Sequence, residues 1–344
     1  MHLKDFEISK LEKSSKTVLR VEISKDEKGE SVQQTLLVIR GNKDGPILLL
    51  TGGVHGDEFE GPQTIMNLFH EIDPEILSGS LVGLVIANEP AYEDANRCNP
   101  IDGKNLARVF PGDPKGSVTE QIAYWMGEIL ISKADYYIDF HSSGSDSEMP
   151  QMCGYFKCNS TGNKLTSQDM AEAFRAKVTW AHPDFAEGRT LSYAYDHVIP
   201  AIYSECPSTR CVSKNDLEVY LRGALNVMKL IGMMQGKLEG SPSKYYLSGN
   251  GDTDQCVSAT TDGCSQRKLR KVLNKAGEGN KNSFPIILSI VISGVVQRRP
   301  VIYGCHLKSF PQPYLTSGSR IKSGKTKKIL FSKPLVNFFS KCSA

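Results

Sequence analysis

The stretch 46–72 constrains the fold more than any other part of this chain. An apolar run ends at Gly52-Gly53, and after a short polar loop an amphipathic pattern with helical spacing begins. The run is typical of a buried strand and the pattern that follows is typical of a helix. His55 and Glu58 are therefore predicted in a strand-to-helix loop, which is where open α/β sheets commonly carry their chemistry.

The His-x-x-Glu spacing provides two side chains that a catalytic zinc ion prefers as ligands. On its own this spacing also fits a polar loop with a surface histidine. A second apolar run, over 134–140, ends in the same way at His141. His55, Glu58 and His141 together match the ligand set of a catalytic zinc site, and Asp139, on the same face of its strand, could orient the His141 imidazole.

Two further features indicate hydrolytic chemistry. The apolar run 199–204 stops at Glu205, and a carboxylate at a strand end can carry a proton from water to a leaving group. The long segment 88–116 carries Arg97 and Arg108, whose guanidinium groups are suited to binding a carboxylate or polarising a carbonyl. Taken singly, these residues would be an acid at a strand end and two surface arginines.

Strand and helix patterns alternate along the first 240 residues, which predicts an α/β fold with a mixed central sheet and helices on both faces. We expect a catalytic domain over 1–240 and a smaller C-terminal part over 241–344 that is β-rich or poorly ordered, and atypical after 264. The residues 149–156 indicate a hairpin near the site. Strands are expected at 17–23, 34–39, 46–50, 81–87, 134–140, 177–181 and 199–204, and helices at 60–72, 117–131, 167–176 and 215–235.

The charge of the chain changes abruptly near residue 265. Residues 265–344 contain 16 Lys and Arg and a single acid, Glu278, whereas residues 1–264 carry a net charge of −12. A basic tether for nucleic acid or an anionic membrane would account for this composition. Long apolar runs within the segment favour the other explanation, a shifted reading frame whose residues were never fitted to the fold.

The composition indicates a cytoplasmic protein. We find no apolar stretch of about 18 residues, and charged residues stand where a signal peptide would be apolar. The nine cysteines form no Cys-x-x-Cys pair, which fits reduced thiols better than a disulfide framework or a thiolate zinc site.

Four ordered motifs between residues 47 and 263 resemble the succinylglutamate desuccinylase/aspartoacylase family, zinc hydrolases related in fold to metallocarboxypeptidases. The motifs are Gly-Gly-Val-His55-Gly-Asp-Glu58, Asp102-Gly-Lys-Asn-Leu-Ala-Arg108-Val-Phe-Pro-Gly112, Asp139-Phe-His141-Ser-Ser and Ile199-Pro-Ala-Ile-Tyr-Ser-Glu205.

The resemblance implies one zinc ion per chain and a role for each matching residue. It assigns His55, Glu58 and His141 as the ligands and Glu205 as the general base and acid. It assigns Arg97 to polarising the carbonyl, with Arg108 and Asn105 as substrate-binding residues.

The resemblance implies a deacylase that cleaves the amide bond of a small N-acylated substrate. We expect no nucleic acid or membrane partner, and a homo-oligomer is left open. The family usually has Leu-Asn-Arg before Phe-Pro-Gly, whereas this chain has Leu106-Ala107-Arg108, so the identity of the substrate is open. A carboxypeptidase and a non-catalytic binding protein with a basic tail are the alternatives.

Overall fold

The computed structural model describes residues 1–25, 29–145, 147–157, 165–183, 186–207, 211–249 and 290–291. The chain divides into two compact units, Met1–Ser293 and Gly294–Ala344, and the second lies outside the described residues. The fold described below is therefore that of the first unit.

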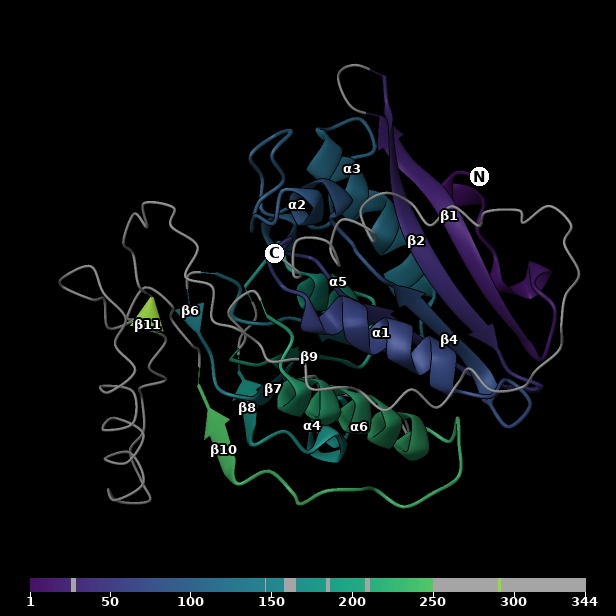
Figure 1. Ribbon diagram of the computed structural model, residues 1–344, viewed down its shortest axis with the longest axis vertical. Coiled ribbons are helices and arrows are strands. Elements are labelled where there is room, and N and C mark those ends of the chain that lie inside the picture. Colours follow the sequence, from purple (N-terminus) through teal and green to yellow (C-terminus); the bar gives the residue numbers. More distant parts are fainter. Residues whose placement is uncertain are drawn as a thin grey trace, which may run out of the picture. The chain divides into compact units, whose positions relative to one another are not determined.

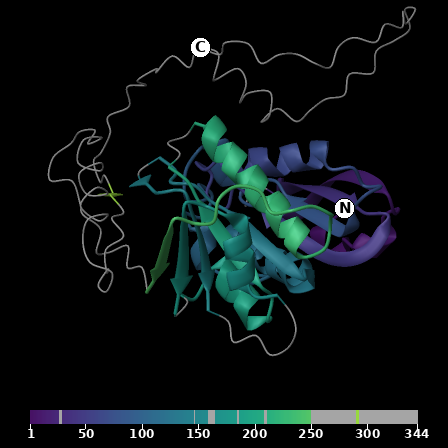
Figure 2. The same cartoon turned by 90° about the horizontal axis from the view of Figure 1, so that it is seen from below.

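A nine-stranded mixed sheet forms the centre of the described part (Figure 1). In Figure 2 the N-terminal strands, in purple, lie at one end of the sheet and the green and teal strands lie at the other. In spatial order the strands are β1 (Ser15–Lys25), β2 (Ser31–Arg40), β4 (Ser78–Leu84), β3 (Lys43–Thr51), β5 (Tyr136–Phe140), β9 (Ala201–Glu205), β7 (Met152–Phe156), β8 (Val178–His182) and β10 (Tyr245–Ser248).

The four middle strands, β4, β3, β5 and β9, run parallel to one another. On one side β2 pairs antiparallel with β4, and on the other side β7 pairs antiparallel with β9. The carboxyl ends of four neighbouring strands thus meet at one edge, which is where ligands bind in open α/β sheets. A second, two-stranded sheet joins β6 (Ser147–Glu148) to β11 (Ile290–Val291).

Helices cover both faces of the central sheet. The apolar core on one face includes side chains of α1 (Glu60–Glu71), α4 (Ser167–Phe174) and α6 (Lys214–Leu230), which lie in front of the sheet in Figure 1. The core on the other face includes side chains of α3 (Val118–Trp125) and α5 (Thr190–Asp196). The short helix α2 (Glu89–Glu93) follows β4.

Local sequence explains why β3 and α1 form where they do. Leu48, Leu49 and Leu50 are all buried, because a central parallel strand has helices on both faces. On α1, Ile65 and Leu68 are buried three residues apart and anchor one face of the helix in the core.

The structure confirms the predicted α/β fold with a mixed sheet and helices on both faces. The expected hairpin over 149–156 is wrong: the segment provides the single strand β7, which pairs with β8 and β9. The domain boundary at 240 stays a prediction, and the segment 265–344, for which a tether or a shifted reading frame was predicted, lies outside the described residues except for 290–291. In the described part of the chain, no helix is long and apolar enough to cross a membrane.

Candidate metal centre and active site

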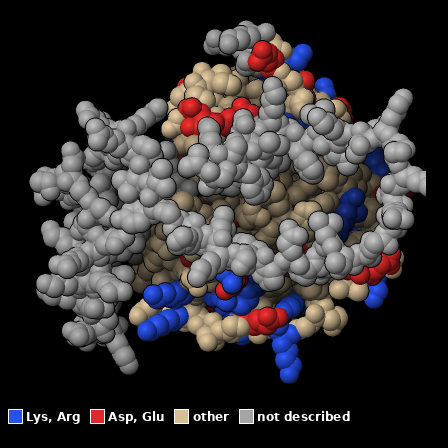
Figure 3. Space-filling model, viewed as in Figure 1, with Lys and Arg blue, Asp and Glu red and all other residues tan. Residues whose placement is uncertain are grey.

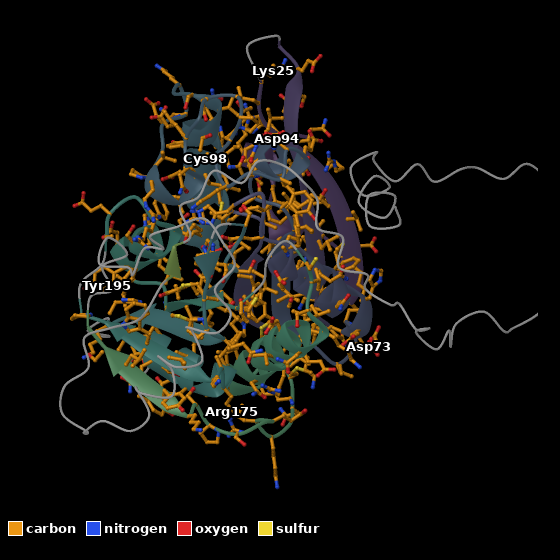
Figure 4. The ribbon with its side chains drawn as sticks, turned by 60° about the vertical axis from the view of Figure 1, so that its left-hand side comes forward. Lys25, Asp73, Asp94, Cys98, Arg175 and Tyr195 are labelled. Atoms are coloured by element: carbon orange, nitrogen blue, oxygen red, sulfur yellow. The ribbon has the colours of Figure 1, made fainter. Side chains whose placement is uncertain are left out.

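The candidate site lies at the carboxyl ends of the four parallel strands. His55 and Glu58 follow β3, His141 follows β5 directly, and Glu205 is the last residue of β9. The segment after β4 carries Arg97, whose neighbour Cys98 is labelled in Figure 4. Strand order therefore brings together side chains that are up to 150 residues apart in the chain.

Two glycines shape the turn from β3 into the ligand loop. A Cβ atom on Gly52 would lie 2.7 Å from the backbone nitrogen of Pro62, so only glycine lets α1 begin this close to the strand. Gly53 has a φ of 61°, a conformation that side-chain-bearing residues adopt at a cost. The Gly52-Gly53 pair thus directs the chain back over the sheet edge and places His55 there.

One carboxylate joins the two histidines. Nδ1 of His55 lies 2.7 Å from Oε1 of Glu58, and Nδ1 of His141 lies 2.9 Å from Oε2 of the same side chain. All three side chains are buried, and their candidate ligand atoms lie within 4.8 Å of one another. They form the one cluster of potential metal ligands found among the described residues.

The outer nitrogens of both imidazoles have partners of their own. Nε2 of His55 lies 3.1 Å from Oδ1 of Asn105, and Nε2 of His141 lies 3.0 Å from Oδ2 of Asp139. Oxygen acceptors at these positions suit an Nε2–H donor in each ring, and a bound metal ion would take the place of a proton at Nδ1. Asn105, expected to bind substrate, thus contacts a candidate ligand, and its substrate role stays a prediction.

Glu58 is held in its charged form. Burial acts to raise its pKa, but the charges of His55 and His141 and their hydrogen bonds outweigh burial and lower the pKa. The backbone nitrogen of Ser142 donates to Oε2 at 3.1 Å, and Nη1 of Arg97 donates to Oε1 at 3.3 Å. A buried carboxylate that stays ionised is suited to binding a cation.

The pKa of Glu205 is shifted in the opposite direction to that of Glu58. Burial and then the nearby charge of Glu58 raise the pKa of Glu205 to about 8, although His141 and Arg97 oppose the shift. Its Oε2 atom is buried and has no hydrogen-bond partner among the described residues. Two carboxyl groups with pKa values shifted in opposite directions are typical of sites where one group binds and the other transfers protons.

Arg97 and Arg108 both lie on the loop after α2, and the loop is tied to α3. Asp102 accepts hydrogen bonds from the backbone nitrogen and hydroxyl of Thr119, at 2.8 and 2.7 Å. Burial, and after it the positive charges of Arg189 and Arg97, lower the pKa of Arg108 to about 10. This region therefore concentrates positive charge and would attract an anionic group.

Arg189 was missed in the sequence, although it immediately precedes α5, on which Tyr195 is labelled in Figure 4. Its Nε atom is buried without a hydrogen-bond partner in the described part of the molecule. Its position in the sequence could have indicated it, because Gly188-Arg189-Thr190 lies at the start of the helix that precedes the strand carrying Glu205.

A zinc ion fits this donor set. The cluster offers two imidazole nitrogens and one ionised carboxylate, the outer nitrogens are held by oxygen acceptors, and the carboxyl group of Glu205, whose pKa is raised, lies nearby. These are the elements of a catalytic zinc site with three protein ligands.

The profile of the succinylglutamate desuccinylase/aspartoacylase catalytic domain matches residues 44–231. The chain belongs to this family. A succinylglutamate desuccinylase/aspartoacylase from Rhodobacter sphaeroides is similar in structure, with a TM-score of 0.64 and 26% identity over 72% of this chain and 76% of that one.

Two other relatives carry names that concern small metabolites. An ectoine utilization protein of Ruegeria pomeroyi, solved with product bound, has a TM-score of 0.62 and 26% identity over 70% of this chain and 73% of that one. The N-alpha-acetyl-L-2,4-diaminobutyric acid deacetylase of Halomonas elongata is 39% identical over 126 residues, 37% of each chain. The match thus spans little more than a third of that curated relative.

The distribution of charge bears on the alternative of a binding protein with a basic tail. Figure 3 shows both basic and acidic side chains on the coloured part of the surface. The excess of basic residues belongs to 265–344, which lies outside the described residues except for 290–291.

Proposed function

We propose that this chain hydrolyses the amide bond of small N-acylated amino acids, with one zinc ion held by His55, Glu58 and His141. The observation that carries the proposal is the pairing of a buried His–Glu–His cluster with Glu205, whose raised pKa suits it to exchange protons near neutral pH. Family membership and the names of the relatives support the reaction class.

We assign each residue a role that its position supports. When bound, zinc would supply a Lewis acid that lowers the pKa of a water molecule to about 7. Glu205 accepts a proton from the attacking water and returns it to the leaving nitrogen. Arg97, which lies at the rim of the cluster, donates to the negative charge that develops on the acyl oxygen.

Arg108 is assigned to the substrate carboxylate. Arg108 is exposed, so a substrate carboxylate can reach its guanidinium and accept charge-assisted hydrogen bonds from it. Arg189 adds to the same positive field. The amine half of the substrate, which carries the carboxylate, would therefore lie on the Arg108 side of Glu205.

The test is an assay of the zinc-loaded full chain against N-acetyl-L-2,4-diaminobutyrate, N-acetyl-L-aspartate, N-succinyl-L-glutamate and a set of dipeptides, with release of free amine as the readout. We expect turnover of at least one N-acyl amino acid. Glu205→Gln is the matched control, since it should keep its zinc and lose on the order of 10²–10⁴-fold in turnover. Faster cleavage of dipeptides would instead favour a carboxypeptidase, and retained activity of Glu205→Gln would remove Glu205 from the mechanism.

A further inference from the structure

Tyr203 lies beside the candidate proton carrier. It precedes Glu205 by two residues on β9, so both side chains lie on the same face of the strand, with Cα atoms roughly 6–7 Å apart. Ala201, the next residue on that face, is buried on a part of β9 that contacts α5, whereas Tyr203 and Glu205 are partly exposed. Tyr203 is thus a partly exposed side chain next to Glu205 on the same face of β9.

The Tyr203 ring is held in place by two neighbours, His182 and Gly154. Its hydroxyl oxygen is hydrogen-bonded to Nε2 of His182 at 2.8 Å, and the His182 ring packs on Trp180 with centroids 4.3 Å apart. Gly154 pairs with Tyr203 in the sheet, and a Cβ atom at position 154 would lie 2.1 Å from the ring. The ring therefore occupies space that only glycine leaves open, and it forms a rigid wall.

The segment 188–190 connects this wall with the Arg108 region. The carbonyl oxygen of Gly188 accepts from the backbone nitrogen of Phe110 at 3.1 Å, and the hydroxyl of Thr190 donates to Asp139, which pairs with Tyr203 in the sheet. Burial lowers the pKa of both Arg108 and His182, and in each case the charge of Arg189 is the next largest cause. The same charge acts to lower the pKa of Tyr203, which burial raises. The charge of Arg189 thus acts on Arg108, His182 and Tyr203 alike, in agreement with these contacts.

We propose that Tyr203 is a specificity-determining residue: its ring limits the length of the side chain on the amino acid that the enzyme releases. The inference rests on the proposed function, because that function assigns the amine half to Arg108. A rigid wall admits short side chains and excludes long or aromatic ones. In an apolar pocket, one methylene more or less on the substrate changes kcat/KM by about 10–200-fold.

The experiment compares two substrates with the same acyl group and the same carboxylate, N-acetyl-L-2-aminobutyrate and N-acetyl-L-phenylalanine. The zinc-loaded full chain should prefer the shorter substrate. In Tyr203→Ala, the ratio of kcat/KM for the phenylalanine substrate to that for the shorter one should rise by about tenfold or more. Tyr203→Phe is the matched control: it keeps the ring, so its ratio should stay within about threefold of the parent ratio.

The outcomes distinguish a failure of the role assigned to Tyr203 from a failure of the proposed function. An unchanged ratio in a folded, zinc-containing Tyr203→Ala variant would overturn the role of Tyr203 and leave the proposed function standing. If Tyr203→Ala does not fold, Tyr203→Leu takes its place, with the same direction expected because the side chain is shorter. No turnover of any N-acyl amino acid by the parent protein would overturn the proposed function, and this assignment with it.

Discussion

Oδ2 of Asp139 lies 3.0 Å from Nε2 of His141, inside a fully buried part of the sheet. The same carboxylate accepts hydrogen bonds from the hydroxyls of Thr51 and Thr190, at 2.6 and 2.5 Å. Three donors on one carboxylate fix its orientation and, through it, the orientation of the imidazole. The partner of a candidate ligand is thus built into β3, β5 and the start of α5.

Replacing Asp139→Asn should weaken zinc binding by about 10–100-fold, the usual effect of losing an outer partner of a metal-binding histidine. An amide has one acceptor oxygen and cannot satisfy all three donors. Zinc affinity is measured by competition with a coloured chelator, with circular dichroism as a check on folding. Asp135→Asn is the control, because the Asp135 carboxylate accepts from the backbone of Ile47 at the other end of β5 and should not affect zinc. Equal affinities for the parent protein and Asp139→Asn would exclude the orienting role.

Replacing Arg108→Ala should reduce kcat/KM for N-acyl amino acids by about 10–100-fold, mainly through a higher KM, because a charge-assisted hydrogen bond contributes about 1.5–3 kcal/mol. The same substitution should change little when the substrate carboxylate is replaced by a carboxamide. The measurement is a comparison of both substrates with both proteins. An equal loss on the acid and on the amide would mean that Arg108 does not bind the carboxylate.

The sequence predicts much of the site because its residues lie at strand ends. His141 and Glu205 each close an apolar run, and glycines mark the turn before His55, so local pattern alone places these residues at one edge of a sheet. The partners of these residues are not local. Asn105 reaches His55 across 50 positions, and no periodicity encodes the path of the loop that carries it.

The sequence did not predict the helix α5 or the pairing of β7, because α5 is short and β7 pairs with strands that are distant in the sequence. The helix α5 has only seven residues, too few for a clear helical period, and its apolar side chains become informative only when packed on the sheet. The residues 149–156 have the composition of a hairpin, but β7 pairs instead with β9 and β8. Pairing of strands distant in the sequence overrides local preference there.

Zinc should stabilise the parent protein against thermal unfolding. A ligand that binds only the folded state at 100 times its Kd adds about 2.7 kcal/mol to the free energy of unfolding. The melting temperature is measured after chelator treatment and again after adding back zinc. In Glu58→Gln the shift should be much smaller, because one ligand is lost and the two histidines lose their shared acceptor. A parent protein that melts at the same temperature with and without zinc would contradict the assigned site.

Asp102 should stabilise the arginine loop in a manner that depends on pH. Its carboxylate accepts from the backbone nitrogen of Thr119, near the start of α3, where a negative charge also interacts favourably with the helix dipole. Burial acts to raise the pKa of Asp102, but the hydrogen bonds that Thr119 and the backbone of Lys104 donate to it help to outweigh burial and lower the pKa. The folded protein therefore binds this proton less readily than the unfolded chain.

A carboxyl group whose pKa is lower in the folded state contributes stability that is complete above its unfolded pKa, about 3.9, and is lost as the pH falls through the folded value. We expect Asp102→Ala to lower the free energy of unfolding by about 1 kcal/mol at pH 7. The difference between the two proteins should start to shrink below about pH 4, where the carboxyl group of the unfolded parent chain becomes protonated, and it is lost once the folded carboxylate is protonated too. The difference in the free energy of unfolding is measured by urea unfolding of both proteins at pH 7, 5 and 3. Asp113→Ala is the control, because Asp113 is an exposed residue on the same loop. A difference that stays constant down to pH 3 would show that the charge of Asp102 has no part in holding the loop.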